Sequence, residues 1–227
     1  MALEATHIRF ALDLKDEIGA KELDKYLSGT IYPDSRYLTK IHRKLTHSDS
    51  YTKKEFYDDD DFKKGWAIHL ICDALQRDIL KELFPDLLKG AGEEIIYGKE
   101  NWITRTAIKI IQDIFDAELI GVKNYVKYLG YCNNPNGEKL DLIKKYNQIF
   151  IDTYNKDLIT YEDEFRMWQM LGLDQDVLEK IIKKTTELKQ NQSVVDRVKK
   201  IYDITKSSYK NAGRSDYFQK SNKRDIL

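Results

Sequence analysis

A histidine and an aspartate lie four residues apart in the stretch "GWAIHLICDAL", where His69 and Asp73 are surrounded by apolar side chains. Residues at this spacing share one face of a helix. Burying either polar group alone is costly, so the pair could hold one cation between them. It could equally be a hydrogen-bonded core pair, in which Asp73 accepts from His69 or from Arg77, one turn further on.

Three more potential ligands precede this pair. His7 falls on the apolar stripe of an N-terminal helix, and Asp34 follows Pro33 in a turn. His47 lies near the end of a predicted helix. Imidazole nitrogens and carboxylate oxygens together suit zinc, with manganese or iron as alternatives. Asp34 could instead cap the next helix, and His47 could be a surface loop residue.

The remaining histidine, His42, lies beside Arg43 and Lys44, a pattern typical of a solvated helix face. We therefore leave it out of the candidate site. All four histidines fall in the first third of the chain, which favours a site built mainly from the N-terminal helices.

The segments "THIRFA", "YLSGTIYPDSRY", "RKLTH" and "GWAIHLICDAL", in this order, resemble the zinc-dependent phospholipase C family of all-helical proteins, in particular its compact bacterial cytoplasmic relatives. The shared features are an early His, a Gly-x-x-x-Pro-Asp turn, a Thr-His pair, and a helix reading Gly-aromatic-x-x-His-Leu-x-x-Asp. The resemblance covers residues 6 to about 80. It implies that Asp34, His47, His69 and Asp73 coordinate one ion. It also implies that His7 approaches the cluster, at a second ion shared through Asp73, and that Asp34 takes a proton from water.

The chain also departs from that family. Secreted members begin, after processing, with a tryptophan whose amino group is a ligand, whereas Met1 stands first here. They take further ligands from a later histidine and a His-x-x-x-Glu pair, but no histidine follows His69. The matching segment offers Arg105, Lys109 and Asp113, either as an intrahelical ion ladder or as a phosphate anchor, Arg105, and a carboxylate ligand, Asp113. A complete trinuclear site is not expected.

The resemblance implies a metal-dependent hydrolase that acts on a phosphoester, either a small phosphorylated molecule or a phosphodiester, with a reduced metal cluster. Arg36, Lys40 and Arg43 could meet the phosphate or face solvent. The alternative is a non-catalytic helical binding or interaction protein with a structural metal or a hydrogen-bonded His/Asp core. An HD-type phosphohydrolase is disfavoured, because no adjacent His-Asp doublet occurs in the sequence.

The elements that must position these residues are predicted to be helices. Three prolines and eleven glycines among 227 residues favour an all-α, single-domain multi-helix bundle. Periodicity predicts helices at about 6–17, 20–28, 35–47, 58–84, 102–119, 140–154, 161–170, 174–189 and 193–206. Gly29 is expected to end the second helix, and Pro33 to hold Tyr32 extended. The carboxylates at 58–61 are expected to open the long helix, with a calcium loop as the alternative.

Composition bounds the partners and the compartment. Lys plus Arg and Asp plus Glu both number 38, so no net charge draws the chain to nucleic acid or to an acidic membrane. No secretory signal or membrane span is evident, and two cysteines are too few for a disulfide framework. We expect a cytoplasmic protein with a helical domain at 1–210 and a flexible polar tail at 211–227. The oligomeric state is left open.

Overall fold

The computed structural model describes residues 3–88 and 96–221, with side chains through residue 211. Within these ranges the chain forms helices and no strand, so the predicted all-α multi-helix fold is confirmed. The α-helices are α1 (Glu4–Ile18), α2 (Leu23–Ile31), α3 (Arg36–Thr39), α4 (Lys54–Tyr57), α5 (Asp61–Leu83), α6 (Glu100–Ile120), α7 (Leu140–Tyr154), α8 (Tyr161–Met170), α9 (Gln175–Lys189) and α10 (Gln192–Ser221). Short 3-10 helices are η1 (Tyr32–Ser35), η2 (Arg43–Leu45), η3 (Asp49–Thr52), η4 (Val122–Asn124) and η5 (Val126–Tyr128).

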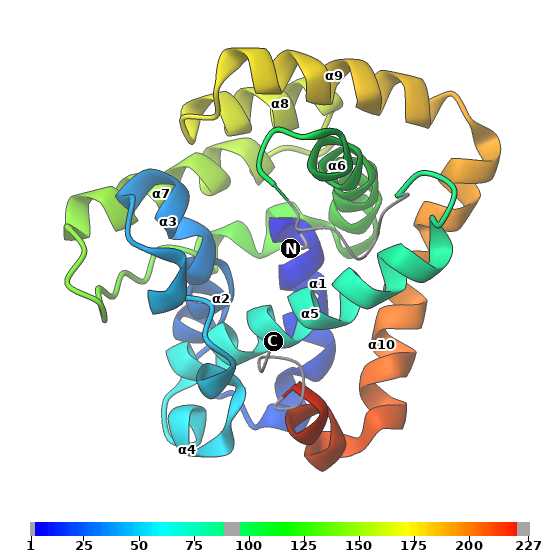
Figure 1. Cartoon of the computed structure of the whole chain (residues 1–227). Coiled ribbons are helices and arrows are strands. Elements are labelled where there is room, and N and C mark those ends of the chain that lie inside the picture. Colours follow the sequence, from blue (N-terminus) through cyan, green and yellow to red (C-terminus); the bar gives the residue numbers. More distant parts are fainter. Residues whose placement is uncertain (1–2, 89–95, 222–227) are drawn as a thin grey trace.

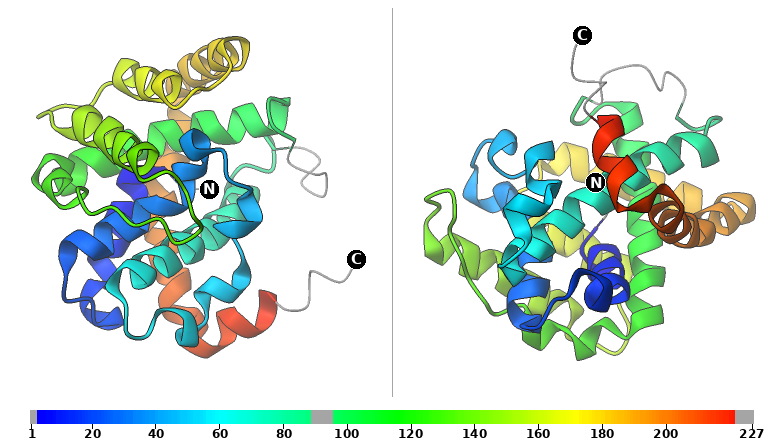
Figure 2. Two further views of the ribbon diagram at one scale, coloured as in Figure 1. Left: turned by 90° about the vertical axis from the view of Figure 1, so that its left-hand side faces the viewer. Right: turned by 90° about the horizontal axis from the view of Figure 1, so that it is seen from below.

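Two long helices organise the molecule. Helix α5 runs across the middle of the view in Figure 1 and packs on α2, α1 and α10. Helix α6 packs on α1 and α9, while α8 and α9 cover its outer side (Figures 1 and 2). The N-terminal helix α1 therefore contacts both α5 and α6, which places its side chains at the centre of the fold.

Helices α2 and α5 cross at two glycines. A Cβ atom at Gly29 would lie 2.0 Å from the carbonyl oxygen of Phe62, and one at Gly65 would lie 1.9 Å from that of Tyr26. Real side chains cannot approach a backbone so closely, so only glycine allows this separation. Gly29 therefore lies inside α2, and the prediction that it ends the helix was wrong.

The start of α5 agrees with the prediction from the carboxylate run. The Asp60 side chain caps the helix by accepting from the backbone N–H groups of Phe62 and Lys63. Asp61 accepts from the backbone N–H groups of Lys21 and Glu22 and so joins α5 to the start of α2. The run at 58–61 does not belong to any group of described side chains close enough to hold an ion.

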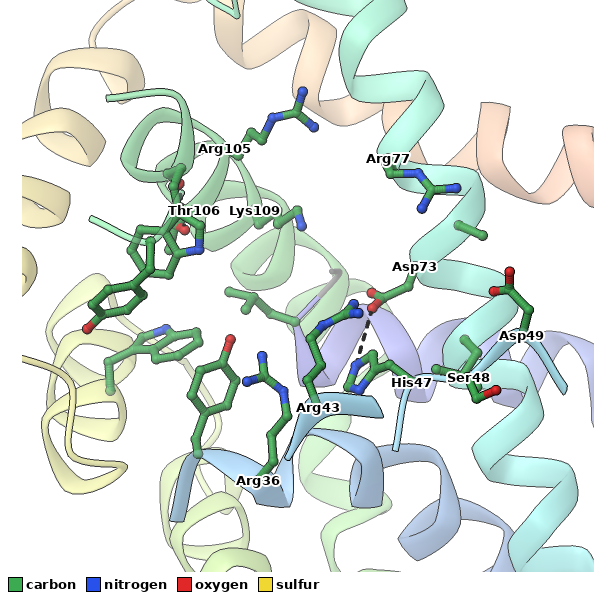
Figure 3. A pocket seen from close by; sticks show the side chains of 17 residues that line it. Arg36, Arg43, His47, Ser48, Asp49, Asp73, Arg77, Arg105, Thr106 and Lys109 are labelled. Atoms are coloured by element: carbon green, nitrogen blue, oxygen red, sulfur yellow. Dashed lines mark hydrogen bonds and ion pairs between the residues drawn. The ribbon is translucent and has the colours of Figure 1, made fainter. Parts of the chain in front are cut away.

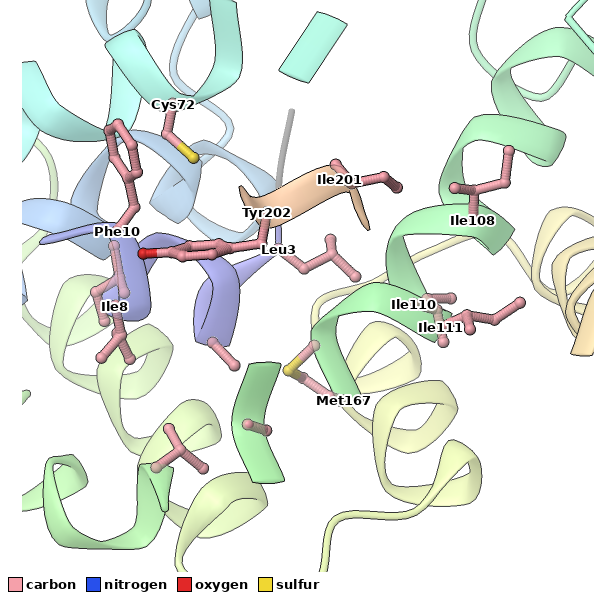
Figure 4. Packing of buried hydrophobic residues seen from close by; sticks show 14 of the residues in the cluster. Leu3, Ile8, Phe10, Cys72, Ile108, Ile110, Ile111, Met167, Ile201 and Tyr202 are labelled. Atoms are coloured by element: carbon pink, nitrogen blue, oxygen red, sulfur yellow. The ribbon is translucent and has the colours of Figure 1, made fainter. Parts of the chain in front are cut away.

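The apolar core is continuous from α1 to α10. Figure 4 shows Ile8 and Phe10 of α1 beside Tyr202 of α10, within one cluster of buried side chains. The guanidinium carbon of Arg9 lies 3.3 Å from the centroid of the Tyr202 ring, whose hydroxyl donates to Asp13 at 2.6 Å. Helix α10 thus covers α1 and holds it against α5 and α6.

The segment between Ile31 and His47 differs from the prediction. A single helix at 35–47 was wrong, because α3 ends at Lys40, which adopts a left-handed conformation with φ of 59°. Tyr32 is helical rather than extended, with φ of −55° and ψ of −42°. Pro33 lies in the first turn of η1, where its missing N–H costs nothing, and Tyr32 is fixed by packing on Phe62 and Trp66.

The C-terminal helix also differs. The backbone of α10 continues to Ser221, well beyond the predicted end near residue 206. Residues 222–227 lie outside the described part of the chain, and the flexibility of the 211–227 tail stays a prediction. Among the described residues, no helix combines the length and the hydropathy that crossing a bilayer requires.

Candidate metal centre

Five predicted ligand residues meet in the interior of the molecule. His7 comes from α1, Asp34 from η1, His47 from the segment after η2, and His69 and Asp73 from α5. His7 and His69 are fully buried, while Asp34 and Asp73 are 2% and 7% exposed. Only 2% of the His47 side chain is exposed. The fold therefore brings together side chains from four separate segments.

The donor atoms are spaced as ligands of a common ion would be. The Nε2 atom of His47 lies 3.5 Å from Oδ1 of Asp34 and 3.8 Å from Oδ2 of Asp73. The Nε2 atom of His69 lies 4.0 Å from Oδ2 of Asp34 and 3.8 Å from Oδ2 of Asp73. These separations are too long for hydrogen bonds. Ligands at zinc bond lengths form a tetrahedron with edges of about 3.3 Å. Two groups of described side chains bring their ligand atoms within 4.8 Å of one another: His47 with His69 and Asp73, and His7 with Asp34 and His69. His69 belongs to both groups.

The tautomer of His69 is fixed by a backbone carbonyl. Its Nδ1 atom lies 2.8 Å from the carbonyl oxygen of Thr30, which can only accept a hydrogen bond. The proton must therefore be on Nδ1, and the lone pair of Nε2 points into the cluster. The close crossing of α2 and α5 at Gly29 and Gly65 allows this contact. A carbonyl partner of this kind orients a ligand histidine and raises its basicity.

A similar arrangement orients His47. The hydroxyl of Thr46 lies 2.8 Å from Nδ1 of His47 and donates to the carbonyl of Arg43 at 3.3 Å. Because the hydroxyl proton is used there, Nδ1–H of His47 can donate to the hydroxyl, which leaves Nε2 unprotonated. Trp66 of α5 donates to the Thr46 carbonyl at 2.7 Å and so holds this segment against the helix.

His7 meets the cluster from a different direction. Its ring stacks on that of His69, with centroids 3.8 Å apart and planes inclined by 14°. Its ligand atom nevertheless lies within 4.8 Å of those of Asp34 and His69, so His7 belongs to one of the two groups that could hold an ion. Nε2 of His7 is also 3.5 Å from Oδ1 of Asp73, whereas His47 and His69 face Oδ2. Asp73 therefore connects His7 to the other ligands.

The electrostatics of the interior favour the metal-binding forms of His7 and His47. Burial, with a contribution from His69, lowers the pKa of His7 to about 3 and that of His47 to about 2. Both rings are therefore neutral near pH 7, the form in which imidazole binds metals. Burial raises the pKa of Asp34, which works against its metal-binding carboxylate form, and the positive charge of Arg36 opposes that shift. Asp34 Oδ1 and the Nε2 atoms of His47 and His69 are buried without a hydrogen bond, so a cation would satisfy them.

Other predicted contributors lie outside the cluster. His42 is exposed, and its Nδ1 accepts from the backbone N–H of Lys44, in agreement with leaving it out. Asp34 does not cap α3. Asp113 accepts from the backbone N–H of Thr6 at 2.9 Å and does not join the ligand groups. Its prediction as a metal ligand is therefore not supported, and no ion pair within the described chain links Arg105, Lys109 and Asp113 into a ladder.

A cavity of about 540 Å³ opens beside the cluster. His47 and Asp73 form part of its wall, and Figure 3 shows both side chains facing it. Five cationic side chains also line it, namely Arg36, Arg43, Arg77, Arg105 and Lys109. Tyr37, Trp102 and Trp168 form an apolar part of the wall. The candidate centre is thus accessible to a small anionic molecule from one side.

The cations on α6 are buried without partners. Lys109 is 8% exposed and Arg105 is 6% exposed, and neither makes a hydrogen bond or ion pair with the described residues. Burial lowers the pKa of Lys109 to about 8 and lowers that of Arg105. The sequence offered both residues as candidates, but not the cavity they share with α3, α5 and α8, because residues far apart in the chain form that wall.

A second buried cluster lies at the start of α1. The Tyr154 hydroxyl lies 2.6 Å from Asp113 and 2.8 Å from Glu164, although it has a single proton to donate. At least one of these carboxyl groups must therefore carry a proton. Burial raises the pKa of Asp113 to about 6 and raises those of Glu4 and Glu164 well above their ordinary values. No sequence pattern indicated this cluster, because its members are up to 160 residues apart.

No protein-family model, curated protein or solved structure matches this chain. The resemblance to zinc-dependent phospholipase C consequently stays a prediction that depends on the motifs alone. The geometry of the His/Asp cluster and its cavity is the evidence from which a function can be argued.

Proposed function

We propose that the protein is a metal-dependent hydrolase of phosphoesters, with one divalent ion held by Asp34, His47, His69 and Asp73. The observation that carries this proposal is that these side chains belong to two groups of close ligand atoms, which share His69, beside a cavity with a cationic wall. Two nitrogens and two carboxylate oxygens suit zinc, and they also accept manganese or iron. Bound there, such an ion would lower the pKa of water and polarise a phosphoryl oxygen.

The protein's own residues would then perform the remaining tasks. His47 and Asp73 lie in the cavity wall, which leaves one side of the ion open to a substrate. Arg36 and Arg43 lie on the same side and could hold the phosphate by charge-assisted hydrogen bonds. Asp34 is buried and is not part of the cavity wall, so we assign it first to the ion. It would accept a proton only from water inside the cluster.

The alternative of a hydrogen-bonded His/Asp core is less well supported by the distances. The contacts from His47 and His69 to the two aspartates are all 3.5 Å or longer, whereas hydrogen bonds of this type are about 2.7–3.2 Å. A purely structural ion would also need no cationic cavity beside it. Both arguments favour a site that binds and processes an anionic molecule.

Metal content and activity test this proposal together. Protein purified without an affinity tag should contain about one equivalent of metal and should hydrolyse some member of a panel of phosphomonoesters, phosphodiesters and choline phosphoesters. The panel is assayed with added zinc and with added manganese. Bound metal without activity across the panel would instead favour a structural site.

Asp73→Asn should remove the metal and lower the melting temperature at the same time. An ion that binds only the folded state stabilises it, by about 2.7 kcal/mol when free ion is at 100 times its Kd. Elemental analysis and thermal unfolding with and without zinc measure the two effects. Glu82→Gln, at an exposed position of the same helix, is the matched control and should keep both metal and stability. Equal metal content in the two variants would contradict the ligand assignment.

A further inference from the structure

The cavity wall carries more positive charge than one phosphate group can neutralise. Its cationic side chains are Arg36, Arg43, Arg77, Arg105 and Lys109, and its anionic ones are Asp49 and Asp73. A divalent ion would offset the two aspartates that bind it. A phosphomonoester carries about two negative charges near neutral pH. A single phosphate would therefore leave much of the wall uncompensated.

Arg105 and Lys109 give the strongest indication of an anionic ligand. Both residues are mostly covered by the protein, yet no hydrogen bond or ion pair within the described residues reaches either, and both line the cavity, where an anion could neutralise their charges. Arg36, by contrast, lies 3.7 Å from a carboxylate oxygen of Asp34. The two cations on α6 do not stabilise the fold through a contact of their own, so their position is explained by a molecule that enters the cavity.

The charged side chains of the cavity wall lie at two levels, an inner one next to the candidate metal centre and an outer one further from it (Figure 3). Lys109 lies at the inner level together with Asp73, a residue of the candidate centre (Figure 3). Arg77 comes four residues after Asp73 in α5, and Arg105 comes four residues before Lys109 in α6; both lie at the outer level (Figure 3). Four helical residues correspond to a rise of about 6 Å. Two anionic groups separated by a few ångströms could contact both levels at once.

We propose that the cavity binds a ligand with two phosphate groups, one at the metal centre and the other between Arg77 and Arg105. The position of the first phosphate rests on the proposed hydrolase function, whereas that of the second depends on the outer cations alone. A volume of about 540 Å³ exceeds the need of a single phosphate, and Tyr37, Trp102 and Trp168 offer an apolar surface to the organic part.

Titration calorimetry with inorganic anions tests the second phosphate position without any hydrolysis. The full chain is first dialysed against a chelator, so that metal cannot contribute to binding. Pyrophosphate should then bind at least about tenfold more tightly than orthophosphate at low ionic strength, because only pyrophosphate reaches both levels. The difference should shrink as salt is added. Equal affinities for the two anions would overturn the proposal.

Variants of the outer level complete the test. Arg105→Gln should weaken pyrophosphate binding about tenfold and bring the two affinities closer together. Arg166→Gln, an exposed change on α8, is the control and should alter neither. If Arg105→Gln does not fold by circular dichroism, Arg77→Gln replaces it with the same expectation. If the protein is an active phosphoesterase but does not bind pyrophosphate more tightly than orthophosphate, only the second phosphate position is overturned. If pyrophosphate binds more tightly than orthophosphate but no phosphoesterase activity is found, only the proposed hydrolase function is overturned.

Discussion

At the scale of single residues, the three histidines of the cluster differ in the contacts that orient their rings. The rings of His47 and His69 are nearly perpendicular, and each is oriented through Nδ1 by a neighbouring oxygen. His7 has no such partner for either nitrogen among the described residues and is positioned by stacking on His69. The three side chains therefore need not contribute equally to an ion, although the sequence offers them as equivalent candidates.

The difference predicts unequal effects of substitution. His69→Gln should abolish metal binding, whereas His7→Gln should retain about one equivalent with an affinity lowered about 10- to 100-fold, the usual effect of losing a supporting contact. His42→Gln serves as the control and should change nothing, since His42 is exposed. Zinc titration followed by calorimetry measures all three. Complete loss of metal in His7→Gln would show that His7 is an essential ligand.

At the scale of elements, the crossing of α2 and α5 determines whether the ligands can meet. The two backbones approach so closely at Gly29 and Gly65 that the Thr30 carbonyl reaches His69. The same approach carries η1, and with it Asp34, to the face of α5 that bears His69 and Asp73. The glycines of the two motifs thus have a structural explanation, because each makes room for the opposite helix.

Filling this crossing should destabilise the protein strongly. Gly65→Ala would place a methyl group 1.9 Å from the carbonyl oxygen of Tyr26, so the helices must separate. Overpacking typically costs 1–3 kcal/mol, and we expect about 3 kcal/mol or more here because the obstacle is backbone. Gly130→Ala meets no atom within 4 Å and should change the free energy of unfolding by less than about 1 kcal/mol. Urea denaturation compares the two, and similar stabilities would refute the close crossing.

Prediction from sequence succeeded where local patterns decide the structure. Helices α7 and α8 have the predicted bounds, because their apolar periodicity is regular and Thr160 forms a capping box at the start of α8. The residues of the His/Asp cluster were singled out because motifs place them at fixed spacings within short segments; their role as metal ligands stays a prediction. The segment at 35–47 was predicted as one helix, since its periodicity does not reveal the left-handed turn at Lys40.

Contacts between distant segments could not be predicted in the same way. The cavity wall combines α3, α5, α6 and α8, and no local spacing links Arg77 to Arg105. The partners of Asp113 are likewise distant: the backbone of Thr6 lies 107 residues away and the Tyr154 hydroxyl lies 41 residues away. A charged residue in an amphipathic helix can pair locally, line a cavity or cap another helix, and only the tertiary arrangement distinguishes these roles.

At the scale of the whole molecule, the buried carboxyl groups around Tyr154 make stability depend on pH. The pKa of Asp113 is raised to about 6 in the folded chain, above its value near 3.9 when unfolded. The folded state therefore holds this proton more tightly. Its stabilising effect is complete below the unfolded pKa and is lost as the pH rises through about 6. The lowered pKa values of His7 and His47 act in the opposite direction, because unfolding lets them bind protons in acid.

Asp113→Asn separates these opposing effects. The stability of the natural protein relative to this variant should fall by about 2–3 kcal/mol between pH 4 and pH 7, because only the natural protein loses the carboxyl proton. The asparagine can still accept from the Thr6 backbone. Urea unfolding of both proteins in chelator at several pH values gives the difference, in which the histidine contributions cancel. A difference that does not change with pH would mean that Asp113 is ionised throughout this range.

The proposed ion ligands all lie between Asp34 and Asp73, whereas the outer cations of the cavity are divided between α5 and α6. The shell that holds the ion is thus built without any residue of α6. Amino-acid changes along α6 can alter which molecules bind while the shell keeps its composition. This separation gives the scaffold a simple route to new ligands, since recognition can diverge on α6 while the proposed centre, built from η1, the segment after η2 and α5, stays unchanged.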